Sequence, residues 1–131
     1  MILTVTLNAS VDRTSSAEDF ILGKINRIPQ PLEVAGGKGL NVTRALITLG
    51  YKKKVLATGF LGGFFGDRLE QLMNEDSIEY DFYKIKNNTR CCLALINKKN
   101  NQITEINENG PFISEEELSG FFEKLETLCK Q

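Results

Sequence analysis

The sequence contains no histidine and no tryptophan, and it has only three cysteines. Without histidine, Ser–His and Cys–His nucleophile pairs are excluded, and so are zinc sites with a histidine ligand. The cysteines are the adjacent Cys91 and Cys92 and the distant Cys129, so no C-x-x-C spacing occurs. Their odd number and their spacing favour neither a zinc cluster nor a disulfide framework. We therefore expect reduced thiols that pack as small hydrophobic side chains, as in a cytoplasmic protein.

An excess of charge and long apolar runs are also missing. The 131 residues include 16 Lys and Arg and 17 Asp and Glu, which gives a formal net charge of −1. This balance excludes a nucleic-acid binder that depends on bulk positive charge. No apolar run approaches the roughly 18 residues of a membrane-spanning helix, and the N-terminus lacks the features of a secretory signal. We expect one cytoplasmic domain that binds neither nucleic acid nor membrane.

The first half of the chain alternates between predicted strands and helices. Residues 2–7 form a short apolar run rich in β-branched side chains, which predicts a buried first strand. Gly36–Gly39 opens a segment with helical apolar spacing, and Gly50 closes it as a C-terminal cap. A second strand over residues 55–58 leads through a glycine-rich turn into another helix, which ends near Met73. This order predicts a parallel α/β sheet.

The second half has a different pattern. Residues 80–85, 91–96 and 103–106 are predicted strands, and the last two form a hairpin that need not belong to the parallel sheet. Ser114 and Glu117 form a capping box at the start of a final helix. The predicted buried stripe of this helix is Leu118, Phe121, Phe122 and Leu125. Since no strand follows this helix, we expect an interrupted α/β fold.

The segment Gly36–Gly37–Lys38–Gly39 is the sharpest local signal for binding. Glycines allow a backbone to approach a ligand closely, and a helix N-terminus presents N–H groups and the positive end of its dipole. Lys38 would add a full charge for an anion such as a sugar phosphate. A tight strand-to-helix turn with a solvated lysine explains the segment equally well. The spacing matches neither the P-loop nor the G-x-G-x-x-G fingerprint.

Three further polar residues are candidates for ligand binding. Asp12 follows the first strand, and ligands of open α/β sheets bind beyond the carboxyl ends of strands. Asn41 lies one turn into the glycine-led helix, where its amide can reach a sugar hydroxyl. Arg90 begins a later strand and can bind a phosphate with two hydrogen bonds. Taken singly, Asp12 fits a turn or capping residue better, and Arg90 fits a solvated surface arginine better.

Several motifs follow one another along nearly the whole chain. They are Met1–Asn8 with Ser10–Asp12, Gly36–Arg44, Ala57–Gly63, Thr89–Arg90, and Thr104–Ile106 with Gly110–Pro111. In this order they resemble the ribokinase-like (PfkB) sugar-phosphate kinases. Within that family, Gly39–Arg44 and Cys92–Ile96 are most similar to the tagatose-6-phosphate kinases. The bacterial 1-phosphofructokinases are the close alternative.

The resemblance implies a partial ribokinase-like (Rossmann-like) parallel sheet with helices and a small β lid. The lid would consist of residues 12–28, 80–96 and 102–106, and it often pairs with a second subunit into a homodimer. The implied reaction is phosphorylation of tagatose 6-phosphate to tagatose 1,6-bisphosphate with ATP and Mg²⁺. The implied substrate-binding residues are Asp12, Gly36, Gly37, Lys38, Asn41 and Arg90.

The chain also departs from the pattern of the family. Ala9 stands where the family usually has proline, and family members are more than twice as long. Their magnesium-associated N-x-x-E motif and their G-A-G-D motif with the catalytic Asp lie beyond the matched part. We therefore expect no catalytic base, no metal ligand and no complete ATP site among these residues, and an inactive isolated chain. The alternatives are a non-catalytic remnant and a lid-mediated binding or dimerisation module, whereas the missing glycine fingerprint disfavours a nicotinamide-dependent enzyme.

Overall fold

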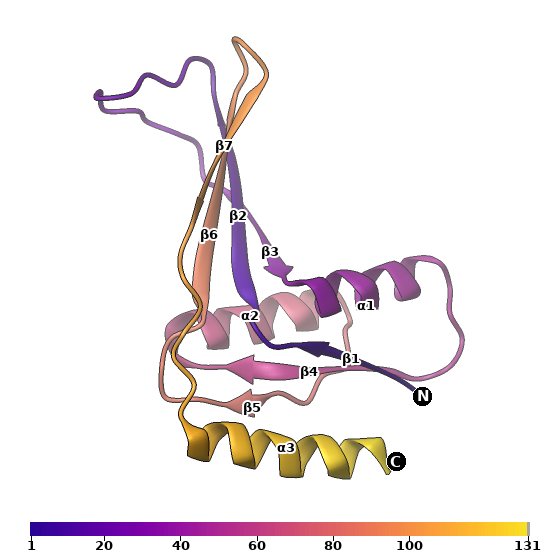
Figure 1. Cartoon of the computed structure of the whole chain (residues 1–131). Coiled ribbons are helices and arrows are strands. Elements are labelled where there is room, and N and C mark those ends of the chain that lie inside the picture. Colours follow the sequence, from indigo (N-terminus) through magenta and orange to yellow (C-terminus); the bar gives the residue numbers. More distant parts are fainter. Residues whose placement is uncertain (131) are drawn as a thin grey trace.

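The computed structural model describes residues 1–130 as two sheets and three helices (Figure 1). The elements are β1 (Ile2–Thr6), β2 (Ser10–Ala17), β3 (Leu32–Gly36), α1 (Lys38–Thr48), β4 (Val55–Leu61), α2 (Gly63–Glu75), β5 (Tyr83–Lys84), β6 (Arg90–Asn97), β7 (Gln102–Asn107) and α3 (Glu115–Cys129). One sheet is parallel with the order β1-β4-β5, and the second sheet has the order β3-β2-β6-β7. The predicted α/β class is confirmed. Among residues 1–130, no helix is long and apolar enough to cross a membrane.

The parallel sheet has helices on both faces. In Figure 1, α1 and α2 lie on one side of β4 and α3 lies on the other. Strand β4 is buried from Leu56 to Leu61, as expected for a central strand covered on both faces. Its alternating side chains serve two cores: Ala57 and Leu61 pack in the cluster that includes Leu69 of α2, whereas Phe60 packs against Phe121 of α3.

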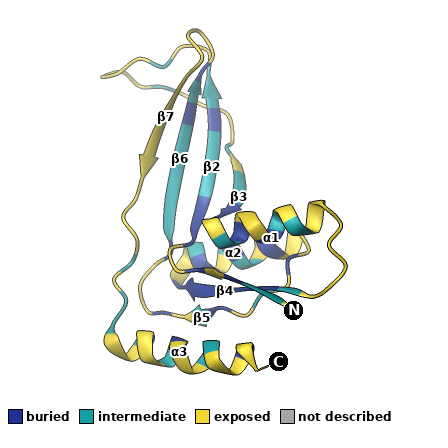
Figure 2. Cartoon of the chain, turned by 45° about the vertical axis from the view of Figure 1, so that its right-hand side comes forward, coloured by how far each residue is buried: buried dark blue, intermediate teal, exposed yellow. Residues whose placement is uncertain are grey.

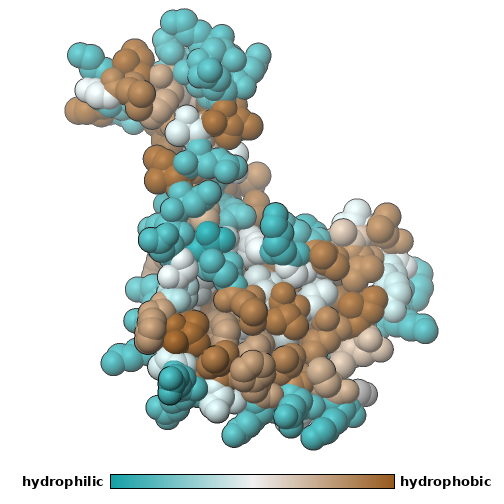
Figure 3. All heavy atoms as spheres, viewed as in Figure 1, coloured by the Kyte–Doolittle hydropathy of each residue, from teal (hydrophilic) through white to brown (hydrophobic). Residues whose placement is uncertain are grey.

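Helix α1 is confirmed, but its apolar spacing marks the outer face. Val42 is 51% exposed and Leu49 is 83% exposed, whereas the buried side chains are Leu40 and Thr43. Gly50 ends the helix with a φ of 72°, as expected for a C-terminal cap. The outer face of α1 is largely exposed in Figure 2, and Figure 3 shows a broad hydrophobic area over the parallel layer. Helical periodicity therefore predicted the element but not the face that it buries.

The second sheet differs in its boundaries from the predicted lid segments. Strand β2 is eight residues long and begins at Ser10, before the predicted lid segment 12–28. It pairs in parallel with β6 and antiparallel with β3, while β6 and β7 form the expected hairpin outside the parallel sheet. The predicted segment 80–96 is divided, because Tyr83–Lys84 pairs with β4 of the parallel sheet. The neighbouring Phe82 and Ile85 are buried in the parallel layer, which holds this segment there.

Helix α3 begins with the predicted capping box. The Ser114 hydroxyl accepts from the Glu117 backbone N–H at 3.2 Å, and the Glu117 carboxylate accepts from the Ser114 N–H at 2.8 Å. The buried stripe is narrower than predicted, because Leu118 is 43% exposed and Phe122 is 53% exposed. A Cβ built on Gly120 would overlap the ring of Tyr83, so this glycine inside the helix permits α3 to approach β5.

The pH dependence of stability tests the cap of α3. The Glu117 carboxylate also accepts the backbone N–H of Lys86 at 2.8 Å, and the hydrogen bonds from Lys86 and then Ser114 lower the pKa of Glu117. A carboxyl with a lowered folded pKa stabilises the fold above its unfolded pKa, and this contribution is lost as the pH falls through the folded pKa. We measure the free energy of unfolding in urea between pH 7 and pH 3. Below the ordinary Glu pKa, this free energy should fall less steeply with decreasing pH in Glu117→Gln than in the wild type. Glu116→Gln, in the same first turn, is the matched control and should show the wild-type dependence on pH. The same dependence in the wild type and in Glu117→Gln would contradict this role.

Candidate functional site

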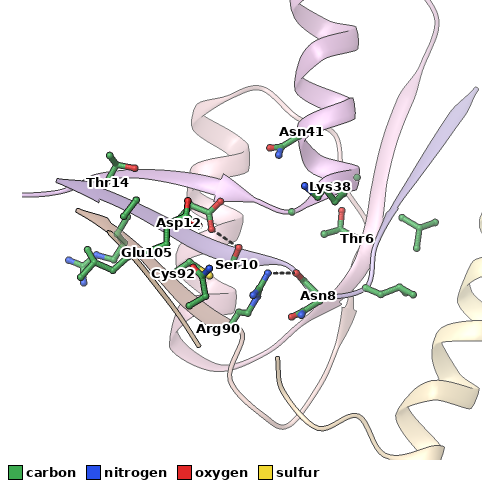
Figure 4. A pocket seen from close by; sticks show the side chains of 18 residues that line it. Thr6, Asn8, Ser10, Asp12, Thr14, Lys38, Asn41, Arg90, Cys92 and Glu105 are labelled. Atoms are coloured by element: carbon green, nitrogen blue, oxygen red, sulfur yellow. Dashed lines mark hydrogen bonds between the residues drawn. The ribbon is translucent and has the colours of Figure 1, made fainter. Parts of the chain in front are cut away.

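A cavity of about 510 Å³ lies where the parallel sheet meets the second sheet (Figure 4). The carboxyl end of β1, the first turn of α1, and strands β2, β6 and β7 all contribute to its walls. Its polar side chains are those of Thr6, Asn8, Ser10, Asp12, Arg13, Thr14, Lys38, Asn41, Arg90, Cys92, Glu105 and Asn107. The cavity is therefore hydrophilic and carries charges of both signs.

Strand register explains why distant residues meet in this cavity. Directly paired residues point to the same face of a sheet. Asp12 of β2 pairs with Cys92 of β6, which pairs with Asn107 of β7. Ser10 pairs with Arg90, two residues earlier on the same face. The second sheet thus presents one polar face to the end of β1 and to α1.

Five of the six predicted site residues line the cavity. They are Asp12, Gly37, Lys38, Asn41 and Arg90. Gly36 is not part of the lining, but a Cβ at this position would overlap the carboxylate of Asp12. Gly36 therefore provides the space that Asp12 occupies. The roles of these residues in ligand binding stay predictions.

The N-terminus of α1 opens into the cavity. Gly37 occupies the N-cap position with a φ of 126°, which favours glycine, and no side chain among residues 1–130 caps the helix. A Cβ on Gly39 would meet the backbone oxygen of Val5, so this glycine lets the first turn lie close to β1. Lys38 is exposed at the same turn. The positive end of the helix dipole and a lysine therefore lie together.

Arg90 and Asp12 provide complementary groups on the second sheet. Arg90 donates from Nη1 to the backbone oxygen of Glu108 at 3.4 Å and from Nη2 to that of Asn8 at 3.5 Å, which are long hydrogen bonds. Its buried Nε has no partner among the described residues. The Asp12 carboxylate accepts the Ser10 hydroxyl at Oδ1 at 2.6 Å, which leaves Oδ2 for a ligand. Such a site offers donors to an anion and an acceptor to a hydroxyl.

The cations of the cavity differ in their ion pairing. Arg13 forms an ion pair with Glu33 at 3.1 Å, and Glu33 also pairs with Arg68 at 2.8 Å, which raises the pKa of Arg68. Within residues 1–130, neither Lys38 nor Arg90 forms an ion pair. Their charges are therefore available to a ligand.

The second glycine-rich turn, between β4 and α2, is filled by the chain itself. Asn88 Oδ1 accepts the Phe64 N–H at 3.0 Å, and the Thr89 hydroxyl accepts the Gly62 N–H at 3.0 Å. These two N–H groups of the turn are therefore not available to a ligand. The described part of the chain also holds no group of three or more His, Cys, Asp or Glu side chains that could bind a metal ion.

All three cysteines are free thiols. Burial raises the pKa of the Cys91 thiol, which keeps it protonated and unreactive. Cys92 lines the cavity, and Cys129 is exposed, so the packed-thiol prediction does not hold for Cys129.

Sequence reasoning missed the contribution of β7 and part of β2. Glu105 and Asn107 line the cavity, although the sequence marked residues 102–106 only as part of a lid. Their position depends on the hairpin register, for which the sequence carries no direct signal. The alternation of Ser10, Asp12 and Thr14 is a polar strand pattern that could have indicated one face of β2.

The protein has an α/β fold, and its cavity brings together hydrogen-bond donors, cationic side chains and carboxylates at the carboxyl end of β1. The model of the pfkB family carbohydrate kinases matches residues 5–131, and the chain belongs to this family.

Solved structures of similar proteins agree with this assignment. A Thermotoga maritima protein assigned as a 1-phosphofructokinase is 36% identical, with a TM-score of 0.84 over 95% of this chain and 40% of that protein. A Staphylococcus aureus protein assigned as a phosphofructokinase is 35% identical, with a TM-score of 0.84 over 95% of this chain and 39% of that one. Phosphofructokinase-2 from Escherichia coli, in complex with fructose-6-phosphate, is 25% identical, with a TM-score of 0.89 and coverages of 96% and 41%.

The chain therefore spans about 40% of the length of these structures. The predicted partial ribokinase-like fold is confirmed by the match to them.

Substitution of Gly36 tests the packing beneath Asp12. We expect Gly36→Ala to lower the free energy of unfolding by about 1–3 kcal/mol, because the new methyl group overlaps the Asp12 carboxylate. The matched control is Gly66→Ala inside α2, where a Cβ would make ordinary contacts at 3.4 Å or more and should stabilise the helix by up to about 1 kcal/mol. Urea unfolding measures the free energy of unfolding of both variants. A Gly36→Ala variant as stable as Gly66→Ala would contradict the close contact between Gly36 and the Asp12 carboxylate.

Proposed function

We propose that this chain forms the sugar-phosphate-binding part of an ATP-dependent PfkB kinase that phosphorylates tagatose 6-phosphate to tagatose 1,6-bisphosphate. The observation that carries this proposal is the cavity that brings together the carboxylate of Asp12 and two cations, Lys38 and Arg90, which form no ion pair among residues 1–130. A phosphate needs the cations, and sugar hydroxyls need hydrogen-bond acceptors. ATP and Mg²⁺ would serve the complete enzyme.

Each of the six predicted site residues has a task in this proposal. Lys38 and Arg90 neutralise the phosphate of the sugar, and Asp12 and Asn41 hold its hydroxyl groups. Gly37 lets the backbone approach the ligand, and Gly36 leaves space for the Asp12 carboxylate. Phosphoryl transfer depends on positioning and charge neutralisation, and these residues supply the positioning of the acceptor sugar. The base and the nucleotide site would come from residues outside 1–130.

The second sheet would act as the lid over the sugar. Its polar face lines the cavity, and Figure 1 shows that the sheet extends away from the parallel layer. In this proposal, the lid comprises the parts of residues 12–28, 80–96 and 102–106 that lie in or beside the second sheet. Strand β3 belongs to the same sheet and would move with it.

A specific observation favours a second substrate. The Thermotoga maritima protein at 36% identity is assigned as a 1-phosphofructokinase, so fructose 1-phosphate is the alternative acceptor for the same cavity. Both sugars carry one phosphate and several hydroxyls, and the same residues would bind either.

Ligand binding tests the proposed site directly. We expect the chain to bind one of tagatose 6-phosphate and fructose 1-phosphate more tightly than the other, and to bind ATP alone far more weakly. Lys38→Met and Arg90→Met should each weaken sugar-phosphate binding roughly 10- to 100-fold, because each removes a charge-assisted contact. Lys52→Met, at an exposed lysine outside the cavity lining, is the matched control and should change nothing. Isothermal titration calorimetry measures the affinities. Binding of neither sugar phosphate, or binding that does not respond to Lys38→Met, would overturn the proposal.

A homodimer through the lid is the partner that we propose. Leu32 is 69% exposed and Ile103 is 63% exposed, and register puts both on the face of the second sheet that lines the cavity. Both edge strands of this sheet, β3 and β7, lack a neighbour on one side among residues 1–130. Open strand edges beside exposed apolar side chains favour association with a second copy.

Sedimentation velocity tests this dimer. We expect a dimer for the wild type and a monomer for the double variant Leu32→Lys, Ile103→Lys, because charges replace apolar contacts across the interface. Leu49→Lys on α1 is the matched control: Leu49 is also exposed and apolar, but it lies outside the second sheet. A monomeric wild type, or dissociation by Leu49→Lys alone, would contradict the lid dimer.

A further inference from the structure

The guanidinium group of Arg44 on α1 connects three parts of the fold. Nη1 donates to Oδ1 of Asn41 at 3.1 Å, and Nη2 donates to the backbone oxygen of Ala35 at 2.7 Å. Nε forms an ion pair with Asp76, at the end of α2, at 3.1 Å. Arg44 does not line the cavity, but Asn41 does, and Ala35 immediately precedes Gly36. Arg44 therefore lies directly behind two parts of the candidate site.

This contact determines which atom of Asn41 faces the cavity. Arginine has five donors and no acceptor, so the atom of Asn41 that it contacts must be the carbonyl oxygen Oδ1 and not the amide nitrogen Nδ2. With Oδ1 occupied by Arg44, Nδ2 and its two protons remain for the cavity. Figure 4 shows Asn41 at the wall formed by α1, across the cavity from Asp12.

We propose that Arg44 is a positioning residue that makes Asn41 a hydrogen-bond donor to the ligand. The ligand atom that meets Asn41 is then an acceptor, a hydroxyl or phosphate oxygen of the sugar phosphate; this part rests on the proposed function. Asp12, in contrast, only accepts, with Oδ2 free and Oδ1 bonded to Ser10. The cavity thus requires a ligand donor on the side of β2 and a ligand acceptor on the side of α1.

The bond to Ala35 supports this role. Nη2 donates to the backbone oxygen of Ala35, so the guanidinium is held in the position from which Nη1 contacts Asn41. A lysine at this position has one compact ammonium group and cannot reproduce the planar arrangement of the three contacts.

A double-mutant cycle separates this role from a general structural one. We expect Arg44→Met to weaken sugar-phosphate binding about fivefold in the wild-type background, the equivalent of one hydrogen bond. In an Asn41→Ala background the same substitution should change the affinity less than about twofold, because a residue that acts only through Asn41 has nothing left to position. Lys84→Met is the matched control: it removes another ion-paired cation, whose partners Asp67 and Glu70 lie outside the cavity lining, and should leave binding unchanged. If Arg44→Met does not fold, Arg44→Lys replaces it in the cycle.

The donor role of Asn41 has its own test. Asn41→Asp keeps an oxygen for Arg44 and adds an ion pair, so its thermal midpoint should equal or exceed that of the wild type. It also removes both Nδ2 protons, so binding should weaken at least tenfold. Retained affinity in Asn41→Asp would overturn the donor assignment.

Nuclear magnetic resonance of the ligand-free chain decides the question without any substrate. The side-chain NH₂ resonances of Asn41, identified by their loss in Asn41→Asp, should move in Arg44→Met and stay in place in Lys84→Met. Two results would overturn the positioning role. One is that the NH₂ resonances of Asn41 do not move in Arg44→Met. The other is that Arg44→Met changes the affinity equally in the wild-type and Asn41→Ala backgrounds. A wild-type chain that binds no sugar phosphate would instead contradict the proposed function, while these spectra still decide the orientation of Asn41.

Discussion

The close contact between the first turn of α1 and the end of β1 is the constraint on which the rest of the structure depends. Thr6 lies between glycines of two elements: a Cβ on Gly37 would overlap its methyl group, and one on Gly39 would overlap its hydroxyl. A Cβ on Gly59 of β4 would overlap the backbone oxygen of Thr6. Side chains at these positions would push the helix and the neighbouring strand away from β1. The glycines therefore bring a helix N-terminus to the end of a strand, where the cavity forms.

The second sheet lines the cavity at this strand end with polar side chains. The turn after β1 carries the chain directly into β2, so the polar face of β2 and its partners stands opposite the first turn of α1. One cation of the cavity, Arg13, is neutralised by Glu33, whereas Lys38 and Arg90 have no ion pair in the described chain. Because the 131 residues have a net charge of −1, the positive charge of Lys38 and Arg90 is local to the cavity and not a property of the whole surface.

The sequence allowed much of this arrangement to be predicted, within limits that have physical causes. The glycine-led turn, the capping box and the strand–helix alternation are local features, and each is confirmed. Asp12 was predicted beyond the end of the first strand, but it lies inside β2 and lines the cavity from there. The burial of α1 was not predictable, because periodicity gives spacing and not direction, and Val42 faces outward. Glu105 reaches the cavity only through the pairing of β6 with β7, which is a long-range property.

The two glycine-rich turns of the chain explain why a local motif cannot identify a binding site by itself. Both turns lead into a helix, and both helices lack a cap from their own N-cap residue. At α2, however, the side chains of Asn88 and Thr89, from a distant segment, accept two N–H groups of the turn. Hydrogen bonds within the protein therefore occupy the groups that a ligand would need. At α1, no side chain of the described residues accepts the corresponding N–H groups, and the turn opens into the cavity. The difference lies in the long-range packing of residues 88 and 89, and the same chemistry is therefore structural in one turn and open to a ligand in the other.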